Sequence, residues 1–147
     1  KNSILKSLQT EDFVQFEITF KSLYASIPYN LFTKNKMYEY EGYYVSVFYS
    51  YLKALGLEII GEDVTNKGRI DLTLKMPNAV FIIEFKVDST SAIQQIKEKH
   101  YHEKYLNENL PIYLVGIEFS TEDRNISKLE WEKIELTPLQ KQILADV

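Results

Sequence analysis

The sequence of 147 residues contains no cysteine, only two histidines, His100 and His102, and no apolar run near the roughly eighteen residues of a membrane span. These absences exclude cysteine-based zinc sites and leave little for a histidine-based one. Basic residues are not in excess either, since 17 Lys and Arg stand against 21 Asp and Glu, giving a net charge of -4. A general polycationic coat for nucleic acid is therefore excluded, and any contact with DNA has to be local.

The ends and the length of the chain give further expectations. The N-terminus lacks the basic, apolar and small-residue order of a signal peptide, and the lack of cysteine fits a reducing compartment, so we expect a cytoplasmic protein with no membrane partner. The length predicts a single domain over residues 1–147. Because the chain opens with Lys1 rather than methionine, we expect it to be a segment of something longer.

The most informative stretch is "GRIDLTLKMPNAVFIIEFKV", residues 68–87, which reads as two apolar strands around a turn. Pro77 and Asn78 suit the central positions of a type I turn, so the strands are expected to form an antiparallel hairpin. Alternation along the first strand predicts that Ile70, Leu72 and Leu74 share one face and that Asp71 lies on the other.

Counting back from this turn places Asp71 directly opposite Glu84, with Lys86 on the same face as Glu84. Two opposed carboxylates repel each other, so the arrangement needs a cation or a shared proton. Taken singly, Glu84 and Lys86 could be an ion pair on a half-exposed face, and Asp71 a solvated strand residue.

The remaining pattern predicts a mixed sheet flanked by helices in one α/β domain. Helices are expected from Phe13 to Pro28, from about Met37 to Leu55 and from Ser89 to Leu106. Further strands are expected at "LEIIGEDV" and "PIYLVGIEF", and an edge strand at "KLEWEKIEL". The strand, helix and strand that follow the turn form a crossover unit, which favours parallel pairing.

Glu41 is followed at helical spacing by a stripe of apolar residues, so it is expected to face the sheet. The stripe consists of Tyr44, Val45, Phe48, Leu52 and Leu55, at offsets of 3, 4, 7, 11 and 14. Glu41 is equally explained as a first-turn glutamate that favours the helix dipole. If Glu41, Asp71 and Glu84 converge, they form a hard oxygen site of the kind that suits Mg²⁺ or Mn²⁺, with Lys86 beside it.

The motifs "GRID" and "EFK" resemble the Asp…Glu-x-Lys signature of the PD-(D/E)XK nuclease superfamily. The surrounding sequence is similar to the bacterial nuclease-like domain that often lies C-terminal to an AAA-ATPase-like domain. The segments that carry this similarity, spread over roughly residues 8–131, are "SIPY", "YEGYY", "TNKGRIDL", "IIEFKV", "QQIKEKHY" and "YLVGIEFS".

The resemblance implies a restriction-endonuclease-like core in α-β-β-β-α-β order with an extra N-terminal helix, at the C-terminal end of a longer chain. It implies DNA as the partner and Mg²⁺ or Mn²⁺ as the cofactor. By the same resemblance, Asp71 and Glu84 would bind the metal, Lys86 would act with the attacking water, and Glu41 would be the helix acid common in such nucleases.

Gln95 matches the polar residue that the superfamily often carries on the helix after the lysine-bearing strand. Two departures stand out: Ile70 replaces the proline of the motif's name, and Tyr101 follows Gln95 by six residues rather than the four of RecB-like nucleases. The roles of Gln95 and Tyr101 therefore stay open, and Gln95 could be an ordinary helix-surface residue.

Two functions remain open at this point. The first is a metal-dependent phosphodiesterase that acts on DNA. It would use all four charged residues: Glu41, Asp71, Glu84 and Lys86. The second is a catalytically silent nuclease-like module that binds or regulates an attached ATPase-like region.

Overall fold

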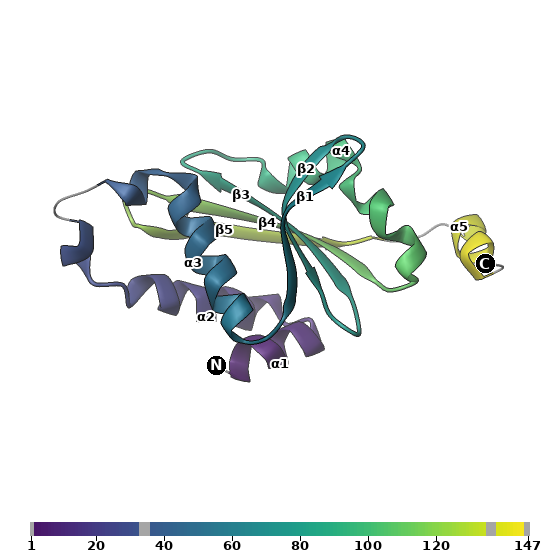
Figure 1. Ribbon diagram of the computed structural model, residues 1–147, viewed down its shortest axis with the longest axis horizontal. Helices are drawn as coiled ribbons and strands as arrows, with labels where there is room; N and C mark the ends of the chain where they lie inside the picture. The colour runs from purple at the N-terminus through teal and green to yellow at the C-terminus, as the bar shows by residue number, and fades with distance from the viewer. Residues whose placement is uncertain (1, 33–35, 135–137, 146–147) are drawn as a thin grey trace.

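The computed structural model describes residues 2–32, 36–134 and 138–145 and has a five-stranded sheet in the order β1-β2-β3-β4-β5 with helices on both faces (Figure 1). The strands are β1 Glu58–Thr65, β2 Gly68–Lys75, β3 Val80–Val87, β4 Ile112–Ser120 and β5 Asn125–Lys133. The α-helices are α1 Asn2–Thr10, α2 Phe13–Ala25, α3 Glu41–Ala54, α4 Ala92–Lys99 and α5 Pro138–Ala145. Three 3₁₀ segments join them, η1 Tyr29–Phe32, η2 Met37–Glu39 and η3 Tyr101–Glu108.

The strand pairing matches the predicted order. β1, β2 and β3 form an antiparallel meander, β3 pairs with β4 in parallel, and β5 pairs antiparallel at the edge. The crossover between β3 and β4 contains α4, as the sequence pattern indicates. The fold is therefore the expected α/β domain with a mixed sheet; residues 135–136 of the predicted edge strand lie outside the described residues.

An aromatic core fills the space between the sheet and α2 and α3. Asp12 caps α2 by accepting a hydrogen bond from the Gln15 backbone N–H at 3.0 Å. Within the core, Phe20 stacks on Phe48 with ring centroids 4.1 Å apart, and Tyr44 stacks on Phe119 at 4.5 Å. These rings hold α3, and with it Glu41, against the face of the sheet that carries Phe85.

A second, smaller core lies on the opposite face of the sheet under α4 and η3. Its members are Ile70, Val80, Ile82, Ile93, Ile96, Tyr101, Tyr105, Ile112 and Leu114. α4 comes very close to β4 at Gly116, where an added Cβ would lie 2.5 Å from the backbone nitrogen of Ile93. Only a residue without a side chain permits this approach.

Two helix predictions need correction, and two helices were not predicted. The helix predicted over residues 89–106 breaks at His100, whose φ of 53° is left-handed, and η3 continues from there. The helix predicted from Met37 begins at Glu41, because Tyr40 is extended and η2 is a separate turn. The pattern also misses α1, which buries Ile4 and Leu8, and the short helix α5.

The prediction that Ile70 shares a face with Leu72 and Leu74 is wrong. Ile70 packs in the core under α4, whereas Leu72 and Leu74 pack in the aromatic core on the other face. Alternation breaks at Asp71 because the position facing it on β1, Glu62, has a left-handed φ of 51° and the regular ladder is interrupted there. Asp71 thus sits where the two strands change face.

Candidate active site

Asp71 and Glu84 lie opposite each other, one step beyond the regular pairs of the β2–β3 hairpin. The turn closes with the Met76 N–H donating to the Ala79 carbonyl at 2.9 Å, and the ladder runs to Leu72 opposite Ile83. At the next step side chains replace the backbone ladder. The Asp71 N–H donates to Glu84 Oε2 at 2.6 Å, and the Phe85 N–H donates to Asp71 Oδ2 at 2.9 Å.

The two carboxyl groups perturb each other strongly. Glu84 is only 1% exposed, and burial together with the neighbouring Asp71 charge raises its pKa to about 8. Burial also raises the pKa of Asp71, although the hydrogen bond from Phe85 opposes this. The interaction between the two side chains raises the pKa of Glu84 further and lowers that of Asp71, so Glu84 is the carboxyl group that favours keeping a proton.

Gln95 projects from α4 onto this pair. Its Nε2 donates to Glu84 Oε1 at 2.7 Å. Glu84 faces Gly116 in the parallel β3–β4 register, and α4 packs against that glycine. The missing side chain at Gly116 is therefore what lets the helix bring Gln95 to Glu84.

Lys86 and Glu41 complete the set at the rim. Lys86 is half-buried, and its charge acts to lower the pKa values of Glu41, Asp71 and Glu84. Glu41, the first residue of α3, is exposed. Partial burial and then the Asp71 charge raise its pKa, so its carboxyl group is within electrostatic reach of the pair.

The three acids do not form a ready-made metal cage. Within residues 2–32, 36–134 and 138–145, no three His, Cys, Asp or Glu side chains are grouped so as to hold a metal ion. Asp71 and Glu84 instead direct oxygens to backbone N–H groups, and Glu41 stands at the rim. The predicted convergence of three carboxylates is thus reduced to a close pair with a third acid nearby.

Two further residues lie near the site: Glu118, which the sequence pattern did not indicate, and Tyr101, whose role it left open. Glu118 on β4 is only 6% exposed and lies opposite Lys86 in the parallel register. Aligning "EFK" with "GIE" as parallel strands would have placed Glu118 opposite Lys86. Burial together with the charges of Glu84 and Asp71 raises the pKa of the Tyr101 hydroxyl, and the Gln95 side chain opposes this.

No helix in the described part of the chain is both long enough and apolar enough to cross a membrane. One curated relative, the "Uncharacterized protein in vnfD 5'region" of Azotobacter chroococcum mcd 1, is 42% identical over 123 residues. The match covers 81% of this chain and 24% of the relative, so the chain spans about a quarter of that protein's length.

A family profile described as the PD-(D/E)XK nuclease superfamily matches residues 39–129, which is more than half of the chain. The matched segment runs from the start of α3 to β5 and includes the Asp71–Glu84 pair, Lys86 and Gln95. A helix, an antiparallel meander, a crossover helix and a parallel strand occur here in the order that the "GRID" and "EFK" motifs imply. The chain belongs to the PD-(D/E)XK nuclease superfamily.

Proposed function

We propose that this domain is a phosphodiesterase that cleaves DNA with the help of Mg²⁺ or Mn²⁺. The observation that carries the proposal is the pair of half-buried Asp71 and buried Glu84, whose carboxyl groups face each other with both pKa values raised. A pair of this kind destabilises the metal-free protein, so a purely structural role does not explain it. Clusters of strongly perturbed groups are typical of functional sites.

The residues present fit a hard divalent cation. Carboxylate oxygens are the ligands that Mg²⁺ and Mn²⁺ prefer, and loss of the shared proton would leave two adjacent negative charges. Asp71 and Glu84 would hold the ion, with Glu41 as a third acid at the rim. When bound, the ion would polarise the scissile phosphate and lower the pKa of a water molecule.

The other side chains have roles that follow from their positions. Lys86 follows Glu84 by two residues on the same strand, and its ammonium group can orient a water molecule or stabilise charge on the phosphate. Gln95 donates to Glu84 Oε1 and so fixes the orientation of that carboxyl group. This orientation keeps the other oxygen of Glu84 on the Asp71 N–H.

A second candidate is a nuclease-like module that binds nucleic acid or an attached ATPase-like region without cleavage. The observation that favours it is that both carboxyl groups already accept backbone hydrogen bonds and that the described residues contain no group of three acids. Under either function we propose that the domain, residues 1–147, lies C-terminal to an AAA-ATPase-like region. The match covers 24% of a longer relative, which supports only that such a domain can be part of a longer chain.

The test is cleavage of DNA by the purified protein in Mg²⁺, in Mn²⁺ and in EDTA, using linear duplex, nicked and single-stranded substrates. We expect cleavage only with metal, and we expect Asp71→Ala, Glu84→Ala and Lys86→Ala to abolish it or reduce it by about 10²–10⁴-fold. The matched control is Lys128→Ala, which removes an exposed lysine from β5 and should leave the rate unchanged.

Binding without cleavage of any substrate, with or without the ATPase-like region, would favour the silent module. Cleavage that persists in both Asp71→Ala and Glu84→Ala would contradict the assignment of the site.

A further inference from the structure

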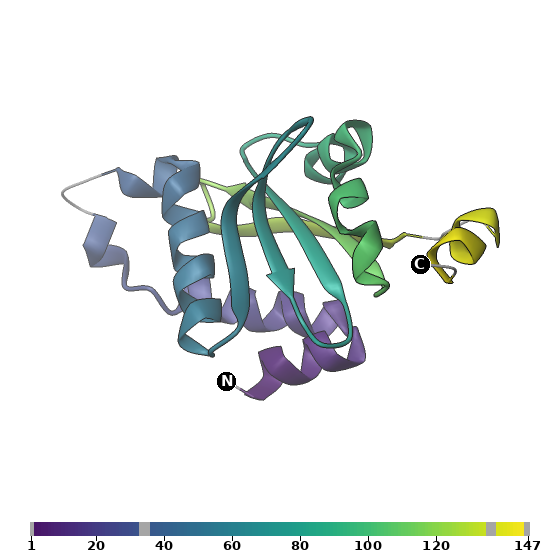
Figure 2. The same cartoon turned by 45° about the vertical axis from the view of Figure 1, so that its right-hand side comes forward.

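The β1–β2 ladder continues well past the end of the β2–β3 ladder. β1 and β2 pair from Glu58–Lys75 out to Thr65–Gly68, whereas the pairs between β2 and β3 stop at Leu72–Ile83. Residues 62–71 therefore form a two-stranded arm that extends beyond the rest of the sheet (Figure 2). The arm starts at Asp71, so its base is part of the candidate site.

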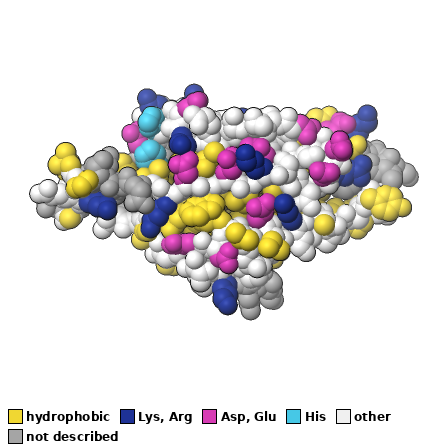
Figure 3. Space-filling model, turned by 180° about the vertical axis from the view of Figure 1, so that it is seen from behind, with side chains coloured by type: hydrophobic (Ala, Val, Ile, Leu, Met, Phe, Trp, Pro, Cys, Tyr) yellow, Lys and Arg dark blue, Asp and Glu magenta, His cyan; other side chains and the backbone are white. Residues whose placement is uncertain are grey.

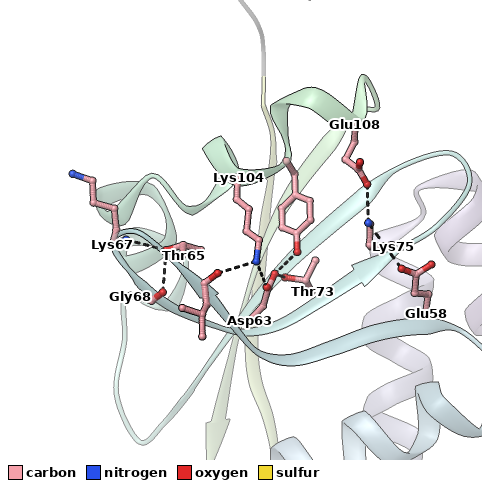
Figure 4. A network of polar contacts seen from close by, with 11 residues as sticks. Glu58, Asp63, Thr65, Lys67, Gly68, Thr73, Lys75, Lys104 and Glu108 are labelled. Carbon is pink, nitrogen blue, oxygen red and sulfur yellow. Dashed lines mark hydrogen bonds and ion pairs between the residues drawn. The ribbon is translucent and has the colours of Figure 1, made fainter.

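The arm is fixed in place by a buried polar network with η3 (Figure 4). Asp63 is 3% exposed and accepts hydrogen bonds from Thr73 Oγ1 at 2.8 Å, from Lys104 Nζ at 2.5 Å and from the Tyr105 hydroxyl. Lys104 Nζ also donates to the Val64 carbonyl at 2.8 Å. A loop that merely connected two strands would not need a buried carboxylate with three donors.

A second contact joins the arm to the catalytic pair. An added Cβ at Gly68 would lie 2.9 Å from the Tyr101 hydroxyl, so the backbone of the arm rests directly on that tyrosine. Gln95, which donates to Glu84, lies close enough to the Tyr101 hydroxyl to lower its pKa. The position of the arm is therefore set relative to the candidate site.

At the tip of the arm, hydrogen bonds hold the backbone of the turn, and the side chains are exposed to solvent. Thr65 Oγ1 donates to the Gly68 carbonyl at 2.9 Å and accepts from the Lys67 N–H at 3.1 Å. The side chains of Val64, Asn66 and Lys67 are exposed. Within the described residues the Lys67 ammonium group makes no hydrogen bond or ion pair, and Figure 4 shows it pointing away from the network.

We propose that the arm, residues 62–71, enters a groove of duplex nucleic acid and places the backbone of one strand at the Asp71–Glu84 pair. This inference rests on the proposed nuclease function. A two-stranded β-ribbon has the width that the major groove of B-DNA accepts. Lys67 contacts a phosphate at the edge of the groove, and Asn66 at the turn faces the base edges.

The charge distribution favours a focused contact of this type. The protein carries a net charge of -4, and the face seen in Figure 3 mixes acidic and basic side chains rather than presenting a basic plane. The two histidines, with ring centroids 6.1 Å apart, lie together near one end of that face with basic side chains beside them. A single exposed lysine on the arm therefore contributes a larger share of the attraction to DNA phosphates here than it would on a polycationic surface.

The experiment measures equilibrium binding of a fluorescent 20-base-pair DNA and of its isolated strand, by anisotropy in EDTA, over a series of salt concentrations. We expect duplex to bind more tightly than the strand, and Lys67→Ala and Lys67→Glu to weaken duplex binding progressively. The slope of log affinity against log salt should fall by about 0.9 in Lys67→Ala, as expected for one lost phosphate contact. Lys128→Ala and Lys128→Glu are the matched controls on β5 and should leave affinity and slope unchanged.

Three results would overturn the proposal: equal affinity for strand and duplex, unchanged duplex binding in both Lys67 variants, or an equal loss in the Lys128 variants. If the parent protein cleaves duplex DNA and the Lys67 variants bind it normally, the proposed role of the arm is wrong and the proposed nuclease function stands. A parent that neither binds nor cleaves nucleic acid overturns the proposed function together with it.

Discussion

At the scale of single residues, the site is organised by a conflict between two carboxyl groups. Glu84 is almost fully buried, and Asp71 lies opposite it on the neighbouring strand. The two carboxyl groups accept hydrogen bonds from two backbone N–H groups and from Gln95, but burial and the Asp71 charge still raise the pKa of Glu84 to about 8. Natural proteins keep such groups, at some expense of stability, where function requires them.

We predict that the metal-free protein loses stability as the pH rises through the pKa of Glu84. This pKa is raised from 4.5 to about 8 in the folded state, so the folded state holds a proton that the unfolded state releases. The resulting contribution is complete below pH 4.5, declines between the two values and is lost above pH 8, on the order of a few kcal/mol. Urea unfolding in EDTA between pH 5 and pH 9 measures this decline.

The control for this prediction is Glu84→Gln, which cannot ionise. Because the amide has one oxygen rather than two, the variant loses a hydrogen bond and is less stable at low pH. Its stability should nevertheless change less between pH 5 and pH 9 than that of the parent. Equal slopes in the two proteins would mean that Glu84 is not the group that titrates.

The residue pair itself could be predicted from the sequence, because a two-residue turn at Pro77 and Asn78 sets the register of every pair behind it. The face of Ile70 could not be predicted, since it depends on a left-handed residue, Glu62, in a different strand. The exposure of Glu41 follows from its position, because the helix begins there after an extended Tyr40. The catalytic roles of Asp71, Glu84, Lys86, Glu41 and Gln95 stay predictions.

At the scale of elements, the close contact of α4 with β4 decides whether Gln95 reaches the pair. We predict that Gly116→Ala destabilises the protein by about 1–3 kcal/mol, because the new methyl group would meet the Ile93 backbone. Displacement of α4 should also remove the Gln95 bond to Glu84 and lower nuclease activity. Denaturant unfolding and cleavage assays measure the two effects.

The matched control is Gly42→Ala in α3, where an added Cβ has no heavy atom within 4 Å. Gly42 is the second residue of α3 and alanine meets no steric obstacle there, so this variant should be as stable as the parent or more so. If Gly116→Ala were equally harmless, α4 would not depend on the glycine for its approach.

Elements with a strong period were predictable, and those set by tertiary contacts were not. The hairpin, the parallel crossover and the edge strand β5 follow from alternation, a turn and chain order. The break at His100 does not, because its left-handed backbone separates α4 from η3, whose Tyr101 and Tyr105 are both buried. The projecting arm could not be predicted either, because the sequence pattern does not indicate that the β1–β2 pairing continues beyond the end of the β2–β3 pairing.

At the scale of the whole molecule, both faces of the sheet are covered, and the site lies where the sheet loses its regular ladder. The aromatic core on one side holds α3 with Glu41, and the smaller core on the other side holds α4 with Gln95. Asp71 and Glu84 lie on the strands between these two layers. The α/β class was predictable because each layer follows from a separate sequence period, whereas the joining of the layers at one site needed coordinates.

The global stability of the molecule separates a cation site from a structural cluster, because the two make opposite predictions for Asp71→Asn. Without metal, this variant lacks the Asp71 charge that disfavours ionisation of Glu84 and keeps an oxygen for the Phe85 N–H, so its melting temperature should equal or exceed that of the parent. Saturating Mg²⁺ should stabilise the parent, by ~2.7 kcal/mol at about 100 times the dissociation constant, and should stabilise the variant much less. Differential scanning calorimetry in EDTA and in excess Mg²⁺ measures both effects. A variant that melts several degrees below the parent in EDTA, together with a parent that does not respond to Mg²⁺, would mean that Asp71 serves the fold rather than a metal ion.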